Sequence, residues 1–536
     1  MRPKGRGDLE SLYFTYPKFE APKDRGRLSD RTPVAIVGAG PVGMIAALTL
    51  AKYGVRSVLI ERKETFNDGS RAICIARQSF YILEQLGAVD AFLKTSLGWT
   101  TGRSFFRGQQ ILEFKMPDGP DDKFRPMYNL EQQYIEQFLF DAVAESDLID
   151  LRWGSEVTGL TDVPDGVELG ISDTLGSYEL LADWVLAADG AHSRVRTIRG
   201  KRLSGENYEG RYVIADVQME HDYPTIRRAL FDPACRPGGT VLIHKQPKNI
   251  WRIDYQLALD ESAEEATQEQ TVRDSVASVL AEIGHTGNWD LEWWSVYSAN
   301  TLALDDYRDG RVFYVGDSAH IVPIFGVRGL NNGLADGQNI GWKLAWVLNG
   351  WAGSDLLDSY SPERRGATLD VFANASKSTR FMTPPTLGWQ VMRDAALSLS
   401  LTHPAMGQLA NPRQMTPYTY LDSPITLSSD DAFRAGPELG AVAADVALAE
   451  GFLTDQFGAG FTVLVFGQAD LDGLDPAVKV LCLPAQGRAA DAYGAEDGTV
   501  YLIRPDMHIA ARWKQVSGGA VQGALRNILN RTEAAA

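Results

Sequence analysis

Three glycines follow the first apolar run of the chain at a spacing that suits a dinucleotide. Gly38, Gly40 and Gly43 come directly after VAIV and open the helix-like stretch MIAALTLAKYG. In such a turn the first glycine permits the sharp bend, the second lets the backbone approach a pyrophosphate, and the third lets helix and strand pack closely. The next apolar run ends in Glu61, whose carboxylate can accept hydrogen bonds from ribose hydroxyls. The pattern predicts a pyrophosphate over a helix N-terminus, against the alternative of a ligand-free turn, and leaves NAD and FAD both open.

Two more carboxylates follow strand-like runs further along the chain. Asp189 stands after WVLAA, and Asp317 stands after RVFYVG. Because the carboxyl ends of parallel strands meet at one edge of an α/β sheet, both acids can reach the same ligand. An acid there can bind sugar-like hydroxyls, including the ribityl chain of a flavin, although either acid alone is as readily a helix N-cap. The glycine-rich loop over residues 326–333 presents N–H groups that suit the electron-rich edge of a flavin.

The elements that must position these residues change in kind along the chain. From residue 33 to 204, strand-like runs alternate with helical stretches, which is typical of an α/β fold with a parallel sheet. Runs such as VIADVQME and NIWRIDYQLAL then indicate a more antiparallel sheet. We predict an N-terminal arm over 1–32, a discontinuous nucleotide-binding domain over 33–204 and 300–370, a substrate-binding sheet domain over 205–299, a helical connector over 371–425, and a small α/β domain over 426–536.

The composition of the 536-residue chain excludes several classes of protein. With 44% hydrophobic residues, disorder is excluded as the main state. A net charge of −17 argues against nucleic-acid binding, and it means that local donors must capture any anionic cofactor. The three cysteines form no CxxC pair, so we expect no metal site and a reducing cytoplasm. The N-terminus lacks the apolar segment of a signal peptide, and no apolar run reaches the roughly 18 residues of a membrane span.

The order of these motifs resembles that of one enzyme family. A GxGxxG turn, the pair Asp189–Gly190 and the pair Gly316–Asp317 are hallmarks of the class A flavoprotein aromatic hydroxylases. This group includes para-hydroxybenzoate hydroxylase, phenol hydroxylase and 3-hydroxyphenylpropionate hydroxylase. The resemblance covers roughly residues 33–370. It implies the α/β fold class, with a Rossmann-like FAD-binding domain of the para-hydroxybenzoate hydroxylase type beside a β-sheet substrate domain.

The resemblance also implies cofactor roles for individual residues. By it, Glu61 binds the adenosine ribose, Asp189 serves FAD and the access of the reductant, and Asp317 binds the ribityl and pyrophosphate region. Many relatives carry a Gly-Gln or similar pair where Val327 and Arg328 stand, so Arg328 either adds a positive charge near the flavin or faces solvent. The full set of implied FAD contacts is Gly38, Gly40, Pro41, Val42, Gly43, Glu61, Arg62, Arg71, Gln132, Asp189, Asp317, Pro323, Gly329, Leu330 and Asn331.

The C-terminal segment YGAEDGTVYLIRPDMHIAARW resembles the end of the thioredoxin-like third domain of the phenol hydroxylase branch. Because this segment has no CxxC, thiol redox chemistry is not available to the domain. We expect Arg504 and Asp506 to hold a turn, and the domain to support folding or the contacts of a homodimer.

The chemistry that the resemblance implies is hydroxylation of a phenolic ring. NADH or NADPH reduces FAD, the reduced flavin reacts with O₂ to a C4a-hydroperoxide, and one oxygen enters the ring. The cofactor performs the difficult step, and the protein supplies orientation and exclusion of water. The alternatives are a flavin oxidase or dehydrogenase on the same fold, a halogenase, which the absence of a WxWxIP motif disfavours, and a flavin redox sensor without turnover.

Substrate contacts are expected on the sheet over residues 205–256. Alternation in WRIDYQLAL places Trp251, Ile253 and Tyr255 on one face and Arg252 and Asp254 on the other. The candidates for catalytic contact with a phenol are Tyr255, Arg252 and His244, each of which could instead be an ordinary sheet residue. The base that activates the phenol is left unassigned, because Cys74 and Ile75 occupy the neighbourhood where some phenol hydroxylases carry an aspartate. We expect His320 to orient a loop.

Overall fold

Strands from residues 31–187, joined by two short strands from residues 308–314, build a largely parallel sheet. The computed structural model describes residues 1–23, 29–69, 72–258, 260–323, 326–411, 416–427 and 433–529. The sheet has the order β17-β18-β11-β1-β2-β8, and β1 pairs in parallel with both β2 and β11. Its strands are β17 (Arg308–Asp309), β18 (Val312–Tyr314), β11 (Gly176–Ala187), β1 (Arg31–Val37), β2 (Ser57–Ile60) and β8 (Ile149–Arg152). The predicted α/β class is confirmed, and β9 (Glu156–Val163) and β10 (Gly166–Asp173) extend β11 as an antiparallel hairpin.

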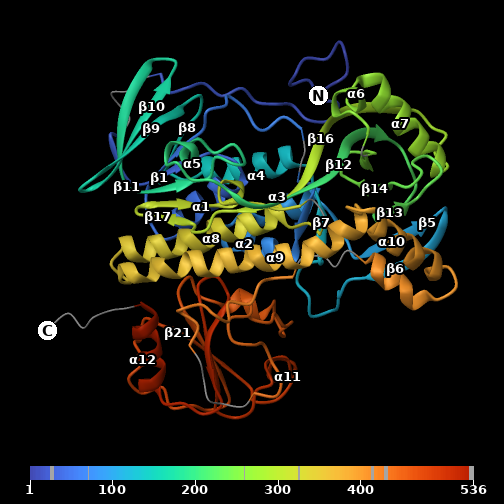
Figure 1. Ribbon diagram of the computed structural model, residues 1–536. Coiled ribbons are helices and arrows are strands. Elements are labelled where there is room, and N and C mark those ends of the chain that lie inside the picture. Colours follow the sequence, from blue (N-terminus) through green and yellow to red (C-terminus); the bar gives the residue numbers. More distant parts are fainter. Residues whose placement is uncertain are drawn as a thin grey trace.

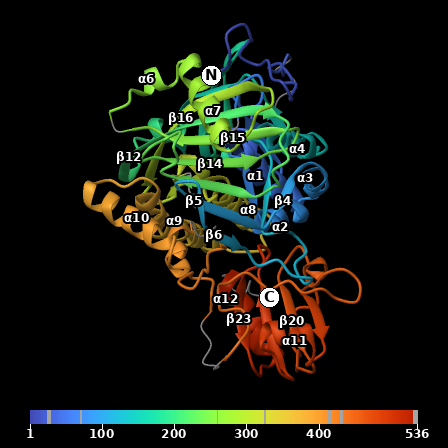
Figure 2. The same cartoon turned by 90° about the vertical axis from the view of Figure 1, so that its right-hand side faces the viewer.

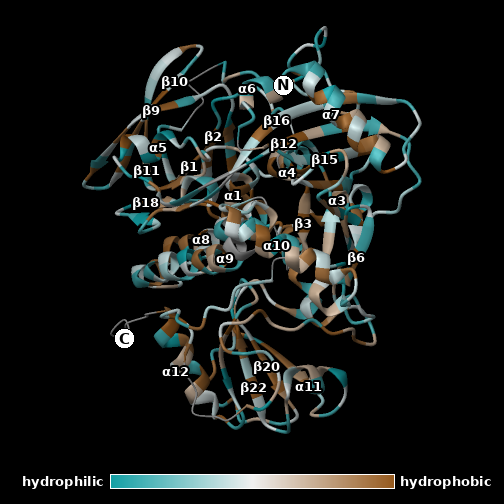
Figure 3. Ribbon diagram, turned by 45° about the vertical axis from the view of Figure 1, so that its right-hand side comes forward, coloured by the Kyte–Doolittle hydropathy of each residue, from teal (hydrophilic) through white to brown (hydrophobic). Residues whose placement is uncertain are grey.

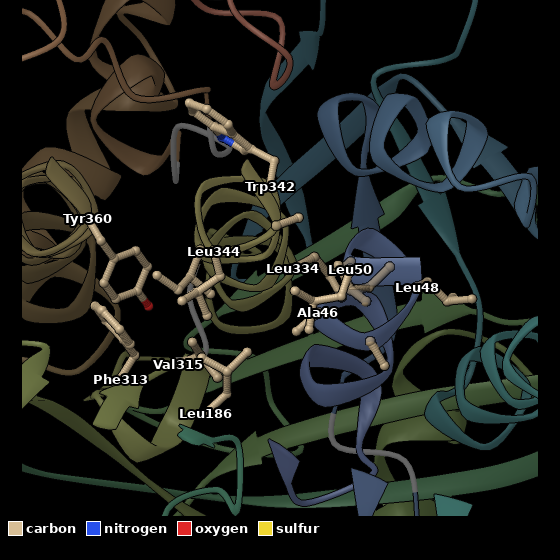
Figure 4. Close-up of a cluster of buried hydrophobic side chains, with 14 of the residues drawn as sticks. Ala46, Leu48, Leu50, Leu186, Phe313, Val315, Leu334, Trp342, Leu344 and Tyr360 are labelled. Atoms are coloured by element: carbon tan, nitrogen blue, oxygen red, sulfur yellow. The ribbon is translucent and has the colours of Figure 1, made fainter. Parts of the chain in front are cut away.

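Two helices pack closely beneath this sheet because glycines line their contact. Helix α8 (Gly329–Leu348) lies on α1 (Pro41–Lys52) through Gly333, Gly337 and Gly341. A Cβ at Gly337 would come within 2.8 Å of the Val42 carbonyl oxygen, so any larger residue would force the helices apart. Figure 4 shows the apolar side chains around this contact, including Leu334 and Leu344 of α8. The contact fixes the N-terminus of α8 next to that of α1.

A second sheet supplies the other wall of the molecule. Its order is β19-β16-β12-β15-β14-β13-β5-β6, and it is antiparallel except where β13 meets β5. Helix α7 (Glu269–Glu282) covers one of its faces (Figure 2). The strands are β19 (His320–Ile321), β16 (Trp289–Ala303), β12 (Ser204–Met219), β15 (Ile250–Gln256), β14 (Thr240–Lys245), β13 (Arg227–Phe231), β5 (Thr101–Phe106) and β6 (Gln109–Lys115).

The domain boundaries of the second sheet differ from the prediction. Strands β5 and β6 come from residues 101–115, which we had placed in the nucleotide-binding domain, and β19 comes from residues 320–321. The pairing of β5 with β13 joins segments more than a hundred residues apart, and local patterning carries no sign of such a contact. A third, small sheet consists of β3 (Cys74–Ala76), β7 (Met127–Asn129) and β4 (Leu97–Trp99). Along the chain, β3 and β4 come before β5 and β6, and β7 comes after them.

Helices connect the two sheets with the rest of the chain. Helices α2 (Arg77–Gln85), α3 (Val89–Thr95), α4 (Gln132–Ala144) and α5 (Arg194–Ile198) belong to the parallel-sheet half. Helix α9 (Tyr360–Met382) runs beside α8 across the middle of the molecule (Figure 1), and α10 (Leu387–Ser400) follows it. No helix among the described residues is both long enough and apolar enough to cross a membrane.

The C-terminal module is a four-stranded sheet of order β21-β20-β22-β23. Strand β20 (Thr462–Phe466) pairs in parallel with β21 (Lys479–Leu483) and antiparallel with β22 (Thr499–Ile503), which pairs antiparallel with β23 (Ile509–Trp513). Helices α11 (Arg488–Tyr493) and α12 (Gly518–Leu529) complete it, and Figure 3 shows the hydrophobic β20 and β22 at its centre. The described segment between β20 and β21 contains no helix. The thioredoxin-like assignment stays a prediction.

Buried charges fasten this module to the body of the molecule. Arg504 donates to both oxygens of Glu363 on α9, at 2.6 and 3.0 Å, and also to Asp506. Lys343 of α8 donates to the same Glu363 carboxylate at 2.6 Å. Arg504 and Asp506 therefore do more than hold the predicted turn, because they join the module to α8 and α9.

The N-terminal arm lies along both sheets. The amino group of Met1 donates to the Trp294 carbonyl oxygen, and Arg2 forms ion pairs with Asp68 and Glu292. The ring of Phe19 stacks on that of Trp153 with centroids 4.2 Å apart. The arm thus bridges the nucleotide-binding half and the second sheet.

Candidate active site

The glycine turn after β1 has the shape that a pyrophosphate requires. Gly38 has a φ of +105°, and a Cβ there would lie 2.4 Å from the Ala188 carbonyl oxygen. A Cβ at Gly43 would lie 2.0 Å from the Gly38 carbonyl oxygen. In contrast, a Cβ at Gly40 would meet nothing within 4 Å. Gly40 is the N-cap of α1 and caps it without a side chain, so the free N–H groups of the first turn border open space.

Glu61 lies at the end of the neighbouring strand β2 and ties the two loops together. Its carboxylate accepts hydrogen bonds from the backbone N–H of Ala39 at 2.9 Å and of Lys63 at 3.0 Å. Arg62 beside it is exposed, as a residue at the outer rim of the site would be. A carboxylate has more acceptor positions than these two, so Glu61 keeps the capacity to bind ribose hydroxyls.

Asp189 follows β11 at the same edge of the sheet. One carboxylate oxygen accepts from the Val195 N–H at 3.0 Å, while the other, Oδ1, is buried without a hydrogen-bond partner among the described residues. The N-cap position of α5 is Ser193, whose Oγ accepts from the Arg196 N–H, and Asp189 adds a second cap, because it accepts from the N–H of Val195 in the first turn of this helix. A buried acceptor without a donor fits a site that a ligand completes.

Asp317 follows β18 in a turn that a buried acid holds in place. Asp317 itself is exposed, whereas Asp336 of α8 accepts from the Gly316 N–H at 2.9 Å. Asp336 also contacts His320 Nε2 at 2.7 Å and Arg364 Nε at 2.6 Å. Burial raises the pKa of Asp336, but Arg364 and His320 outweigh it and lower that pKa. His320 therefore orients the loop, as predicted, and Asp336 is a supporting residue that motif matching did not find.

The loop before α8 is strained and cross-linked. Val327 has a φ of +62°, an unfavourable value for a β-branched residue. The Asn331 side chain accepts from the Ala76 N–H and the Ser79 hydroxyl and donates to the Val327 carbonyl, so it holds this loop against β3 and α2. Gly329 and Leu330 are half-buried in the first turn of α8, and Pro323 is buried ahead of it.

Three further residues that the resemblance singled out have different outcomes. Gln132 is the first residue of α4, and its amide donates to Glu136 at 2.8 Å and accepts from the Ala72 N–H at 3.4 Å. Arg71 lies outside the described residues. Arg328 is buried and faces Asp370 electrostatically, so the expectation that it faces solvent is not met.

A row of buried polar side chains crosses the face of the second sheet that α7 leaves uncovered. Arg252 of β15 donates to both oxygens of Asp216 on β12, at 2.7 and 2.8 Å. His244 of β14 is in register with Arg252, and Arg227 follows on β13. Asp254 lies two residues from Arg252 on the same face, with 4.0 Å between Nε of Arg252 and Oδ1 of Asp254. These residues form the polar row.

The polar row faces the nucleotide-binding half. Cys74 of β3 interacts electrostatically with Arg227, Arg252 and Asp254, and its thiol donates to Asn129 at 3.0 Å. Asn129 in turn donates to the Lys245 carbonyl oxygen at 2.7 Å. Buried atoms without hydrogen-bond partners among the described residues gather on this face: Oδ1 of Asp254, Nδ1 of His244, Oγ of Ser104 and both amide atoms of Gln246.

Burial shifts the ionisation of the polar row in opposite directions. It raises the pKa of Asp254 to about 7, although Arg252 and Arg227 oppose this. It lowers the pKa of His244 well below its ordinary value, and Arg227 and Arg252 add to that effect. It also raises the pKa of the Cys74 thiol to about 12. At neutral pH His244 and Cys74 are uncharged.

Tyr255 does not belong with the other two candidates for catalytic contact. It packs in the apolar cluster beneath α7, together with Trp251 and Ile253. Successive side chains of a strand point to opposite faces, so Tyr255 is directed away from Arg252 and His244. The alternation itself was predicted correctly, and it separates Tyr255 from the other two candidates; contact of Tyr255 with a phenol finds no support in this position. Asp216, Arg227 and Asp254 were not among the predicted candidates, although the structure places them in the polar row with Arg252 and His244.

A cavity of about 420 Å³ lies beside the N-terminus of α8. Its wall combines apolar and aromatic side chains, such as Met116 and Tyr418, with the polar side chains of Arg328 and Asn331. Residues of α2, α8, α9 and the segment before the C-terminal module all contribute. Its lining and volume suit a small aromatic molecule.

Comparison with known proteins places the chain in a family. The family described as FAD binding domain matches residues 31–375, and the chain belongs to it. The cofactor of this family is FAD, and the glycine turn, Glu61, Asp189 and Asp317 stay its predicted contacts. The free helix N-terminus at Gly40 and the unpartnered oxygen of Asp189 fit its pyrophosphate and hydroxyl groups.

Relatives with names are similar to part of this chain. A 3-(3-hydroxy-phenyl)propionate/3-hydroxycinnamic acid hydroxylase of Mycolicibacterium smegmatis is 29% identical over 363 residues, which is 67% of this chain and 63% of that protein. Its namesake from Mycobacterium avium is 30% identical over 62% of this chain and 58% of that protein. The chain thus matches about three fifths of the length of these relatives.

Solved structures share the fold of nearly the whole chain. The flavin-dependent monooxygenase PieE, solved with FAD and substrate, has a TM-score of 0.76 at 24% identity and covers 94% of this chain and 99% of its own. Aklavinone-11 hydroxylase, solved with FAD and aklavinone, has a TM-score of 0.77 at 22% identity, with 94% of this chain and 100% of its own covered. The likeness establishes the fold, including the C-terminal module.

Proposed function

We propose that the protein is an FAD-dependent monooxygenase that uses NADH or NADPH and O₂ to hydroxylate the ring of a phenolic carboxylic acid. The observation that carries the proposal is the polar row, which is buried where the second sheet faces the FAD-binding half. The unpartnered atoms on this face support a polar aromatic ligand, since buried polar groups require hydrogen-bond partners.

Arg227 supports a carboxylate on the substrate. The residue is 6% exposed, burial lowers its pKa, and no carboxylate of the described residues lies within ion-pair distance of it. A buried cation is costly without an anionic partner, and a substrate carboxylate would supply one. The names of the relatives, hydroxyphenylpropionate and hydroxycinnamic acid hydroxylases, describe phenols that carry a carboxylate.

The roles of the chain and of its cofactor are distinct in this proposal. FAD, when bound, supplies hydride acceptance from the reductant and the activation of O₂. The glycine turn and Asp189 hold the cofactor, while Arg227 and the polar row orient the ring. Helix α7 and the apolar cluster beneath it close the back of the sheet, which excludes water from the reacting groups.

The first test is the consumption of NADH and NADPH by the purified flavoprotein against a panel of phenols with and without a carboxylate, with peroxide counted alongside. We expect phenolic acids to accelerate consumption with little peroxide. If all reducing equivalents emerge as peroxide, the oxidase alternative holds. If FAD binds and no aromatic compound changes the rate, the dehydrogenase or redox-sensor alternatives replace the proposal.

The second test separates Arg227 from its neighbour in sequence. Arg227→Gln should raise KM for a phenolic acid about 10- to 100-fold, as loss of a charged hydrogen bond does, with little change in kcat. Arg228→Gln is the matched control, because Arg228 lies on the opposite face, 3.8 Å above the Tyr223 ring. An equal rise in KM for both variants, or for phenols without a carboxylate, would contradict the assignment.

The proposal extends to a homodimer formed through α10. This helix buries Arg393, Leu397 and Ser400 and turns its apolar side chains to solvent; Leu387 is 75% exposed and Met392 is 65% exposed. The exposed side chains present on the order of 600 Å² of mostly apolar surface, close to the roughly 800 Å² that each partner buries in a standard interface. We call Leu387, Trp389, Val391, Met392, Leu399, Leu401 and Leu409 the α10 face.

A second copy of the chain is the partner that fits the α10 face. Because each copy carries a charge of −17, contact is opposed least where apolar side chains gather, as on the α10 face, and the nearby Asp394 is paired with Arg393. The face is self-complementary about a two-fold axis, since Leu387 of one copy can lie against Leu399 of the other. The proposed location is the cytoplasm, which the free thiols of Cys74, Cys235 and Cys482 support.

A further inference from the structure

We propose that Asp254 is the base that accepts the proton of the substrate phenol, and that the Arg252–Asp216 pair positions it. The inference deepens the proposed function and rests on it. It concerns a residue that neither the motifs nor the family resemblance identified.

The geometry leaves one carboxylate of the polar row unoccupied. Both oxygens of Asp216 accept from Arg252, at 2.7 and 2.8 Å, so this acid is committed to the ion pair. Oδ1 of Asp254 has no hydrogen-bond partner among the described residues, and its nearest cationic nitrogen in the pair is 4.0 Å away. The side chain of Asp254 keeps 10% of its surface accessible, against 2% for Arg252. An acceptor is therefore available on the face that meets the FAD-binding half.

Asp254 has apolar residues beside it on the neighbouring strands and charged residues further along the sheet. In the sheet it stands in register with Ile214 of β12 and Leu242 of β14. The titratable groups that face it are Arg252 and Asp216 along the sheet, Arg227 and His244 across the sheet, and Cys74 from β3. Arg252 is held by Asp216, so it stays fixed beside Asp254 without neutralising it.

Among the titratable groups that face Asp254, Cys74 and His244 are less suited to take the proton. The pKa of the Cys74 thiol is about 12, so it remains protonated and cannot accept. Burial, Arg227 and Arg252 hold the pKa of His244 well below the ordinary histidine value, which makes it a weak base. Asp254 has a pKa of about 7, so its carboxylate holds a proton about a thousandfold more tightly than an exposed aspartate. A base with a pKa close to the working pH is the most effective.

The proton transfer has a defined place in a balanced reaction. The phenol O–H bond breaks, the proton forms a bond to Oδ1 of Asp254, and the electron pair stays on the phenol oxygen, which activates the ortho and para carbons. The O–O bond breaks, one oxygen atom forms a C–O bond to such a carbon, and the other leaves as water. NADH or NADPH supplies a hydride and is oxidised to NAD⁺ or NADP⁺, and solvent supplies the second hydrogen of the water as a proton. The ring carbon then loses its hydrogen as a proton, Asp254 returns its proton to the oxygen, and the aromatic ring is restored.

The test uses Asp254→Asn, which keeps the size of the side chain and removes the base. In the flavoprotein we expect the rate of hydroxylation to fall about 100- to 10,000-fold with little change in KM. The wild-type rate should rise through about pH 7, whereas Asp254→Asn should lose this limb and regain rate only near pH 10, where a phenol ionises unaided. Asp254→Glu should restore part of the rate. Asp290→Asn, at an exposed position of the same sheet, is the matched control and should behave as the wild type.

A second measurement does not need turnover. A nitrophenol carboxylic acid bound to the oxidised protein should ionise in two steps in the wild type, because it shares protons with Asp254, and in one step in Asp254→Asn. One step in both proteins, or loss of the pH 7 limb in His244→Gln but not in Asp254→Asn, would overturn the assignment. Failure of every phenol to bind would instead contradict the proposed function, and this inference would fall with it.

Discussion

We predict that Gly40 is needed to bind the cofactor but not to form the fold. Because a Cβ at this position meets nothing within 4 Å, Gly40→Val should leave the folded protein intact. The new side chain would occupy the space over the α1 N-terminus that we predict for the pyrophosphate of FAD. We expect the variant to purify with most of its yellow colour lost and with an unchanged far-ultraviolet circular dichroism spectrum.

The matched control is Gly523→Val on α12, where a Cβ also meets nothing within 4 Å but no cofactor is near. It should keep both the colour and the fold. Full flavin occupancy in Gly40→Val would show that the turn does not hold the pyrophosphate as described.

A second residue to consider is Asp254, because it lies on a different part of the fold from the aspartate that some phenol hydroxylases carry. Cys74 and Ile75 replace the aspartate that the family resemblance led us to seek on the FAD-binding side. Asp254 instead comes from the sheet opposite, close enough to Cys74 for the two to interact electrostatically. Under the proposal above, the carboxylate that accepts the phenol proton would therefore come from the second sheet and not from the FAD-binding half.

At the scale of elements, α8 contacts both the predicted cofactor site and the C-terminal module. Its glycines let it approach α1, its Asp336 holds the turn that carries Asp317, and its Lys343 reaches the network that docks the C-terminal module. A single helix therefore couples the cofactor turn to the distant module. Helix α9 completes the coupling through Glu363, which is fully buried between Lys343 and Arg504.

Removal of Glu363 should therefore be costly. Glu363→Ala leaves Lys343 and Arg504 buried without their shared anion, and we expect the free energy of unfolding to fall by about 3–5 kcal/mol. Chemical denaturation of the flavoprotein measures this. Glu113→Ala, which removes an exposed partner of Arg103, is the control and should cost about 0.5 kcal/mol or less. A similar small loss for both variants would contradict the docking role.

The same network sets an acid limit on stability. Burial opposes ionisation of Glu363, but Arg504 and Lys343 lower its pKa to about 2. Since unfolded glutamate has a pKa of about 4.3, this contribution is complete above that pH and is lost as the pH falls toward 2. The difference in stability between the wild type and Glu363→Ala should shrink over the same interval.

At the scale of the whole molecule, the α10 face predicts the oligomeric state. We expect light scattering coupled to size-exclusion chromatography to give twice the chain mass at micromolar concentration. Met392→Glu, which places a charge within the face, should give the mass of one chain with the flavin spectrum unchanged. Leu175→Glu, at an exposed leucine on the β10–β11 connection, is the control. A monomeric wild type would contradict the proposed dimer.

The sequence by itself determined the cofactor-binding edge. Gly38, Gly40 and Gly43 follow one strand, and Glu61, Asp189 and Asp317 each follow another. These local strand–turn units already predict that the residues lie at the same edge of one parallel sheet. The turn chemistry of such a unit depends on residues adjacent in the chain. This is why the fold class and the family could be predicted without coordinates.

Only the tertiary structure decided which side chains face the substrate. Alternation separated Tyr255 from Arg252, but it could not say which face α7 covers. The polar row joins residues of four strands, β5 comes to β13 from more than a hundred residues away, and Asp336 supports a turn formed by residues 316–318. These relations depend on pairing and packing between segments distant in sequence, and local residue patterns do not encode that information.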